Sequence, residues 1–242
     1  MNELLLLFSV VFIFGAALLA YYLFGKAGLF VVSACASILA NIEANMLIVG
    51  FGMEQTLGNV LFAVTFLITD ILSECESKHN AQIAVWLGVF ASVFFLVLNQ
   101  SWLFYTPSAN DIAMPHVQAF FGSTPRILLA SLTVYVVSQL FDVWLFHKWW
   151  NFTEKKTGSR RAHLWLRNTG STLVSQIINT LLFTVLAFIG TYDIPTIISI
   201  FLSSYVIYIF TSILDTPFVY GARHLKETGK VGLLTAKNPS LH

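Results

Sequence analysis

The chain has 242 residues, of which 57% are hydrophobic and 10% charged, with a formal net charge of +1 and a mean hydropathy of +0.76. Soluble domains carry about 25% charged residues, so this composition excludes a water-soluble fold. The near-neutral charge also argues against a nucleic-acid partner, which requires a concentrated basic surface. The sequence therefore predicts an integral membrane protein in contact with the lipid bilayer.

Apolar runs separated by short polar segments predict seven transmembrane helices, since each crossing needs about 20 residues. The predicted spans cover residues 4–24, 29–51, 59–74, 81–105, 125–147, 170–190 and 195–220. The third run is short and ends in acidic residues, so we expect a tilted, re-entrant or half-length helix there. The predicted fold class is an all-α polytopic bundle of six to seven transmembrane helices, forming one domain over residues 1–222 with a cytoplasmic tail at 223–242.

The basic residues alternate with the predicted spans. Twelve of the 13 fall after the first span, after the third, in the 148–167 loop and in the tail. The connections at 52–58, 106–124 and 191–194 contain none, and Arg126 lies at the mouth of the fifth span. Because cytoplasmic loops are rich in Lys and Arg, this pattern favours an odd number of spans with the N-terminus outside and the C-terminus in the cytoplasm.

Several polar residues interrupt the predicted spans. A charged side chain at the bilayer centre costs about 2.5–3.5 kcal/mol, so such residues usually line a pathway. Asn41 and Asn45 are four residues apart and share one helical face, as do Asp70 and Glu74. The two acids can share a proton or neutralise a cationic ligand. In the alternative interpretation, Glu74 reaches the interface and is hydrated.

The fifth and sixth spans add further polar groups. Gln139 and Asp142 lie in one, and Gln176 and Asn179 in the other. Amides and carboxylates can hold the edge of a planar heterocycle while aromatic rings stack on its faces. Arg126 either joins this site or pairs with a buried acid to fix helix positions. The predicted substrate-binding residues are Asn41, Asn45, Asp70, Glu74, Arg126, Gln139, Asp142, Gln176 and Asn179.

Eight short runs occur in a specific order along the chain. They are TDILSE at 69–74, WLG at 86–88, TPRILLAS at 124–131, SQLFDV at 138–143, LRN at 166–168, GST at 170–172, SQ at 175–176 and DTPF at 215–218. As a set they resemble the putative vitamin uptake transporter family, also called the queuosine precursor transporter family, over about residues 41–222.

This resemblance implies a transporter of the bacterial cytoplasmic (inner) membrane that imports a queuosine precursor, either prequeuosine base or queuine, for tRNA modification. It also implies a fold similar to the six-helix substrate-binding component of energy-coupling-factor transporters, to which the first span would be an addition. The sequence departs from the family pattern at Met46 and Tyr208, where the family has Lys, and at Asn179, where it has Asp. Loss of an acid and a base together suggests that neutral groups replaced a buried ion pair in concert.

Other functions remain open at this point. The chain can be a substrate-binding subunit of a multi-protein importer, or a transporter of another purine-like or vitamin-like molecule, and it can form a homo-oligomer. An enzyme is not expected, because the sequence contains neither H-E-x-x-H nor G-x-S-x-G. We expect no cofactor, and no metal site because Cys35 and Cys75 lack ligand spacing.

Overall fold

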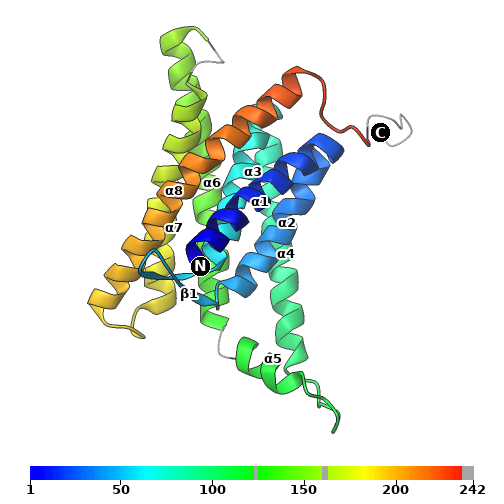
Figure 1. Ribbon diagram of the computed structural model, residues 1–242, viewed down its shortest axis with the longest axis vertical. Helices are drawn as coiled ribbons and strands as arrows, with labels where there is room; N and C mark the ends of the chain where they lie inside the picture. The colour runs from blue at the N-terminus through cyan, green and yellow to red at the C-terminus, as the bar shows by residue number, and fades with distance from the viewer. Residues whose placement is uncertain (123–124, 160–162, 236–242) are drawn as a thin grey trace.

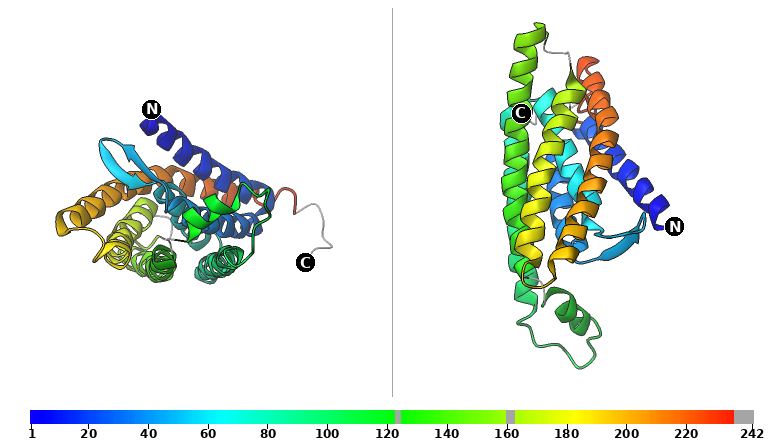
Figure 2. Two further views of the ribbon diagram at one scale, coloured as in Figure 1. Left: turned by 90° about the horizontal axis from the view of Figure 1, so that it is seen from below. Right: turned by 90° about the vertical axis from the view of Figure 1, so that its left-hand side faces the viewer.

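The computed structural model describes residues 1–122, 125–159 and 163–235, which form a bundle of long helices (Figures 1 and 2). The elements are α1 (Asn2–Phe24), α2 (Lys26–Glu43), β1 (Leu47–Gly50), β2 (Met53–Thr56), α3 (Gly58–Cys75), α4 (Lys78–Trp102), α5 (Met114–Phe121), α6 (Pro125–Thr157), α7 (Leu164–Phe188) and α8 (Ile194–Glu227). Among the described residues, seven helices are long and apolar enough to cross a membrane. The predicted polytopic helical membrane fold is therefore confirmed.

Helix α3 lies at the centre of the bundle. It packs against α1, α2, α4, α6 and α8. In the most apolar part of α3, 83% of the residues are buried inside the bundle. In the other six long helices the buried share is between 22% and 50%. It is one continuous helix of 18 residues, in place of the re-entrant or half-length segment that its polar end suggested. A central helix meets protein on every side, so it can carry polar groups that lipid would not tolerate.

The second predicted span, 29–51, is too long. Helix α2 ends at Glu43, and the residues after it form an antiparallel hairpin in which Leu47 pairs with Thr56 and Gly50 with Met53. The two turn residues, Phe51 and Gly52, both have positive φ, at 55° and 72°, as a two-residue hairpin turn requires. Hydropathy misassigned this segment because a short apolar strand and the end of an apolar helix look alike in composition.

Two other predicted boundaries fall inside helices. Helix α6 continues past 147 to Thr157, so much of the predicted 148–167 loop is helical, and α8 passes 222 and ends at Glu227. Lys and Glu form helices nearly as readily as Leu. A loss of hydropathy therefore marks where a helix leaves the apolar layer and not where the helix ends.

Helix α1 lies obliquely across the outside of the bundle, over α2, α3 and α8 (Figure 1). At its start, Asn2 Nδ2 donates a hydrogen bond to the carbonyl of Val49 at 2.8 Å, and the Phe51 N–H donates to Glu3 Oε1 at 3.2 Å. At its other end, the N–H groups of residues 232–234 donate to the carbonyls of residues 21–23 at distances between 2.9 and 3.4 Å. Both ends of α1 are thus fastened to other segments.

The first turn of α3 packs directly on the last turn of α2 through a glycine. A Cβ atom built on Gly58 would lie 2.8 Å from the Ala40 carbonyl oxygen and 2.9 Å from the Ala44 nitrogen. Both of these are backbone atoms, so no side chain can turn aside to make room. Glycine at this position therefore sets the distance between α2 and α3.

We expect Gly58→Ala to lower the free energy of unfolding by about 1–3 kcal/mol, the usual effect of overpacking. Thermal unfolding of the detergent-purified protein measures this change. Gly15→Ala is the matched control, because a Cβ there meets nothing within 4 Å and alanine favours the helix. Equal melting temperatures for the two variants would contradict the proposed contact.

Candidate functional site

A small cavity with several polar side chains in its wall lies between α2, α3, α6, α7 and α8, near the hairpin. We call this end of the bundle, where β1, β2 and α5 lie, the hairpin end, and the opposite end, where residues 228–235 lie, the tail end (Figure 1). The cavity has a volume of about 40 Å³. Since one water needs about 10–15 Å³, this conformation has room for a few waters and not for a bicyclic base. The lining residues include Thr56, Asn59, Phe62, Ser131, Asn179, Phe183, Ser204 and Tyr208.

The polar groups of the cavity wall centre on Asn59. Its Oδ1 accepts hydrogen bonds from the Tyr208 hydroxyl at 3.0 Å and from Thr56 Oγ1 at 3.2 Å. Its Nδ2 is buried and has no hydrogen-bond partner among the described residues. A buried donor without a partner is costly, so this amide group is available for a ligand in the cavity. The ring centroids of Phe62 and Tyr208 lie 6.4 Å apart, and the Phe62 ring adds an aromatic face to the cavity wall.

A layer of side-chain amides continues from the cavity into the bundle. Asn179 Nδ2 donates to Gln176 Oε1 at 3.0 Å, and Ser138 Oγ donates to Asn179 Oδ1 at 3.4 Å. Gln139 bridges from α6 to α3, where its Nε2 donates to Thr65 Oγ1 at 2.5 Å. This layer joins α3, α6 and α7 by hydrogen bonds.

Two aspartates lie beyond the amide layer. Asp70 on α3 and Asp142 on α6 are both completely buried, and their carboxyl groups contact each other. Each also accepts a hydrogen bond from α7: Thr172 Oγ1 donates to Asp70 Oδ2 at 3.2 Å, and Ser175 Oγ donates to Asp142 Oδ1 at 2.6 Å. We call Asp70 and Asp142 the carboxyl pair.

A third aspartate, Asp215 on α8, lies near the carboxyl pair and is also buried. Asn168 Nδ2, on the same face of α7, donates to Asp215 Oδ1 at 2.7 Å. In the described part of the chain, none of these three aspartates forms an ion pair with Lys or Arg. Three acids thus share a region whose other partners are hydroxyls and amides.

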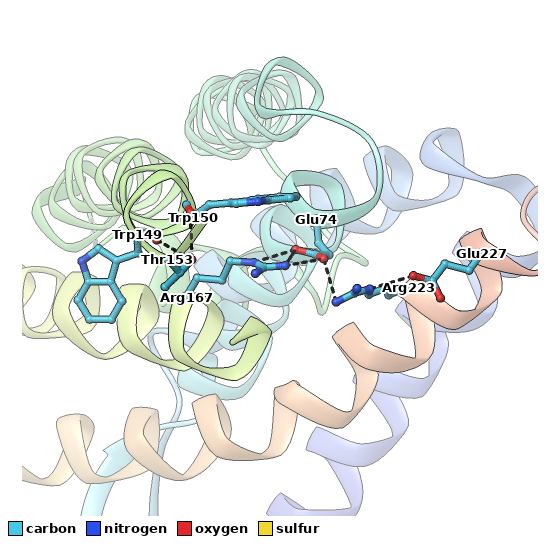
Figure 3. A network of polar contacts seen from close by, with 7 residues as sticks. All are labelled: Glu74, Trp149, Trp150, Thr153, Arg167, Arg223 and Glu227. Carbon is cyan, nitrogen blue, oxygen red and sulfur yellow. Dashed lines mark hydrogen bonds and ion pairs between the residues drawn. The ribbon is translucent and has the colours of Figure 1, made fainter. Parts of the chain in front are cut away.

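An ion pair closes this polar region toward the tail end (Figure 3). Arg167 Nη2 lies 2.7 Å and 2.6 Å from the two carboxylate oxygens of Glu74, and Arg167 Nε donates to Glu74 Oε2 at 3.0 Å. Arg223 Nη1 approaches Glu74 Oε1 at 3.5 Å. The Arg167 guanidinium also lies over the Trp150 ring, 4.3 Å from its centroid. Through these ion pairs Glu74 links α3 to both α7 and α8.

We call the whole series of groups the polar column. It comprises Asn59, Tyr208, Asn179, Gln176, Gln139, Asp70, Asp142, Asp215, Glu74 and Arg167. At the tail end the column reaches a cleft of about 340 Å³, whose lining includes Glu74, Glu76, His147 and Trp150. The column thus connects the two ends of the bundle through its interior.

The polar column contains six of the nine residues predicted to bind substrate, namely Asp70, Glu74, Gln139, Asp142, Gln176 and Asn179. Of the nine, Asn179 alone lines the cavity itself. The predicted pairing of Asp70 with Glu74 does not occur: Glu74 turns to Arg167, and Asp70 faces Asp142. Helical spacing put the two acids on one face of α3 but could not reveal which neighbours that face meets.

The remaining predicted residues lie apart from the column. Asn41 Nδ2 donates to Ser92 Oγ on α4 at 3.0 Å, and Asn45 Nδ2 donates to the Asn41 carbonyl at 3.2 Å. Arg126 donates to the carbonyls of Leu186 at 2.9 Å and Ile189 at 2.6 Å, at the end of α7. Arg126 therefore pairs with neither Asp70 nor Asp142 and holds the start of α6 against the end of α7.

Sequence reasoning missed Asn59 and Arg167. Asn59 stands out only as an amide in the first turn of the third apolar run. Arg167 stands in the run LRN at 166–168, but it was counted with the basic residues of the predicted 148–167 loop and not with the site. Tyr208 was singled out as a departure from the family pattern, as was Asn179. The Tyr208 hydroxyl lies beside the Asn179 side chain, and both line the cavity. These two positions are therefore neighbours, as a concerted exchange of a buried pair requires.

A polytopic helical bundle crossed by a buried polar column is the organisation of a membrane transporter. The chain belongs to the putative vitamin uptake transporter family, whose model matches residues 56–222. It is 36% identical over 219 residues to a Bacillus subtilis (strain 168) protein named "Probable queuosine precursor transporter", covering 90% of this chain and 93% of that protein. No solved structure matches the chain. The family predicted from the ordered runs is thus confirmed.

We expect Arg167→Met to lower the free energy of unfolding by about 3–5 kcal/mol, because it leaves the buried Glu74 carboxylate without its main partner. Chemical denaturation in detergent measures the change. Adding Glu74→Leu to Arg167→Met should restore much of the loss. Glu227→Gln, which removes the exposed partner of Arg223, is the control and should cost less than about 1 kcal/mol. Unchanged stability of Arg167→Met would contradict a structural role for the ion pair.

Proposed function

We propose that the protein imports a queuosine precursor, prequeuosine base or queuine, across the bacterial inner membrane without changing it chemically. The observation that carries this proposal is the free Nδ2 donor of Asn59 in the wall of an amide-lined and aromatic-lined cavity. A deazaguanine base presents donors and acceptors along one edge and two flat faces, which amides and aromatic rings can bind together. The name of the Bacillus subtilis relative supports the same class of substrate.

The acids of the polar column fit a substrate that carries an amine. A precursor with an aminomethyl group is cationic, and carboxylates deeper in the bundle attract a cation. The cavity itself is too small for the base in this conformation, so binding requires the helices around the cavity to separate. A closed conformation between two open ones is what an alternating-access transporter requires.

We also propose that the tail end faces the cytoplasm and the hairpin end faces outside. The support is the distribution of charge along the helices: Lys26 and Lys78 each begin the helix that follows a tail-end turn, and Lys155 and Lys156 lie in the last turn of α6. Among the described residues of the hairpin end, Arg126 is the one Lys or Arg side chain. The positive-inside rule favours this orientation.

We expect Asn59→Ala and Asn179→Ala each to reduce uptake about fivefold or more, because each leaves a polar group of the base unpaired at a cost of about 1–3 kcal/mol. Queuosine in tRNA, measured in cells that lack precursor synthesis and their own transporter, reports uptake at limiting precursor. Asn99→Ala is the matched control, since Asn99 is equally buried but lies on α4 outside the cavity. Normal uptake by both cavity variants, at equal membrane levels, would exclude the cavity as the binding site.

The orientation is tested by reporter fusions. Alkaline phosphatase is active only outside the cytoplasm, so a fusion after Ser108, between α4 and α5, should be active. Green fluorescent protein fused to the C-terminus should fluoresce, because it folds in the cytoplasm. The opposite pair of results would reverse the orientation and place the cavity at the cytoplasmic end.

A further inference from the structure

We propose that the carboxyl pair, Asp70 and Asp142, is a proton-binding site that couples substrate import to the movement of protons. This inference rests on the proposed transport function and adds its energy source. One member of the pair lies on the central helix α3 and the other on α6. Both are completely buried, about midway along the polar column, between the amide layer and the Glu74–Arg167 ion pair.

The contact between the two carboxyl groups requires a proton. Asp70 Oδ1 and Asp142 Oδ2 are buried and have no hydrogen-bond donor among the described residues. Two carboxylates in contact repel each other, and each would lose its hydration without gaining a cation. One proton held between them leaves the pair with a charge of −1, and a second proton leaves it neutral. The site can therefore take up and release a proton while remaining folded.

No positively charged side chain among the described residues contacts the carboxyl pair. A bound proton is therefore the counter-charge available to it. Asp215 faces the pair from α8, and α7 presents the neutral hydroxyls of Thr172 and Ser175. Glu74, one turn farther along α3, is held by Arg167 of α7 and Arg223 of α8. From α1, α2 and α4, no described charged side chain contacts the pair. Protonation is thus the means by which these acids become compatible with their site.

One face of α7 links the carboxyl pair to the substrate cavity. Along this face, Asn168 contacts Asp215, Thr172 contacts Asp70, Ser175 contacts Asp142, and Asn179 lines the cavity. These positions are separated by four, three and four residues, so they follow one another turn by turn. A shift of α7 when the base binds Asn179 necessarily moves the two hydroxyls that hold the carboxyl pair. Substrate binding and proton binding are coupled through this helix.

The proposal is tested with the purified full-length chain in liposomes, using radiolabelled prequeuosine base. Two quantities are measured: exchange of base across the membrane without a gradient, and accumulation driven by an inward proton gradient, with the membrane potential held at zero. For one proton per base, a gradient of one pH unit supports about tenfold accumulation. We expect this accumulation from the wild type and from Glu43→Gln, the control, because Glu43 ends α2 away from the carboxyl pair.

Asp70→Asn and Asp142→Asn should slow exchange, because each removes a charge that attracts the amine of the base, and should reduce driven accumulation to a ratio of about one. This steady-state ratio does not depend on the rate of exchange, so it separates loss of coupling from weaker binding. If either variant fails to fold, Thr172→Val and Ser175→Ala, which remove the hydroxyl donors, should shift the external pH of half-maximal accumulation. Wild-type exchange without any response to the proton gradient, or normal driven accumulation by both Asn variants, would overturn the proposal alone. Absence of both exchange and binding in the wild type would overturn the proposed function itself.

Discussion

A polar group buried in this bundle can find a partner only in the protein or in a ligand or water bound inside it, because surrounding lipid offers neither donors nor acceptors. This constraint explains why α3 occupies the centre: it carries Asp70 and Glu74, and their partners come from α6, α7 and α8. The outer helices α1 and α8 bury far less of their surface. The polar column is thus both the reason for the helix arrangement and the candidate pathway through it.

Hydropathy alone located the seven long helices, because bilayer thickness fixes how many apolar residues a crossing needs. It could not locate the hairpin at 47–56, where an apolar strand follows a helix, or the polar end of α6. The site could be predicted in part, because a polar residue in an apolar run is easy to recognise. Acids within apolar runs, such as Asp70 and Asp142, stand out in any sequence. The approach of Arg167 to Glu74 depends instead on where α6 and α8 hold α7 relative to α3, which no local pattern encodes.

Residues that were grouped with the site because of their helical spacing can lie outside it, because spacing does not say which neighbour a helix face meets. Asn41 and Asn45 do share one side of α2, and the Asn45 amide donates to the Asn41 carbonyl. That side faces α4, however, where Asn41 meets Ser92, and the cavity is formed instead by Asn59 and Tyr208. Helical periodicity assigns residues to a face, but only the packing of whole helices decides whether that face meets a pathway or another wall.

The fastening of α1 at both ends has a mechanical consequence. A helix of 23 residues is about 35 Å long and behaves as a stiff rod over that distance. Its first turn is bonded to the hairpin that adjoins the cavity, and its last turn is bonded to residues 232–234 beyond α8. A displacement of the hairpin would therefore tilt the rod and move residues 232–234, about 35 Å away. The oblique first helix thus links the hairpin end of the protein mechanically to its tail end.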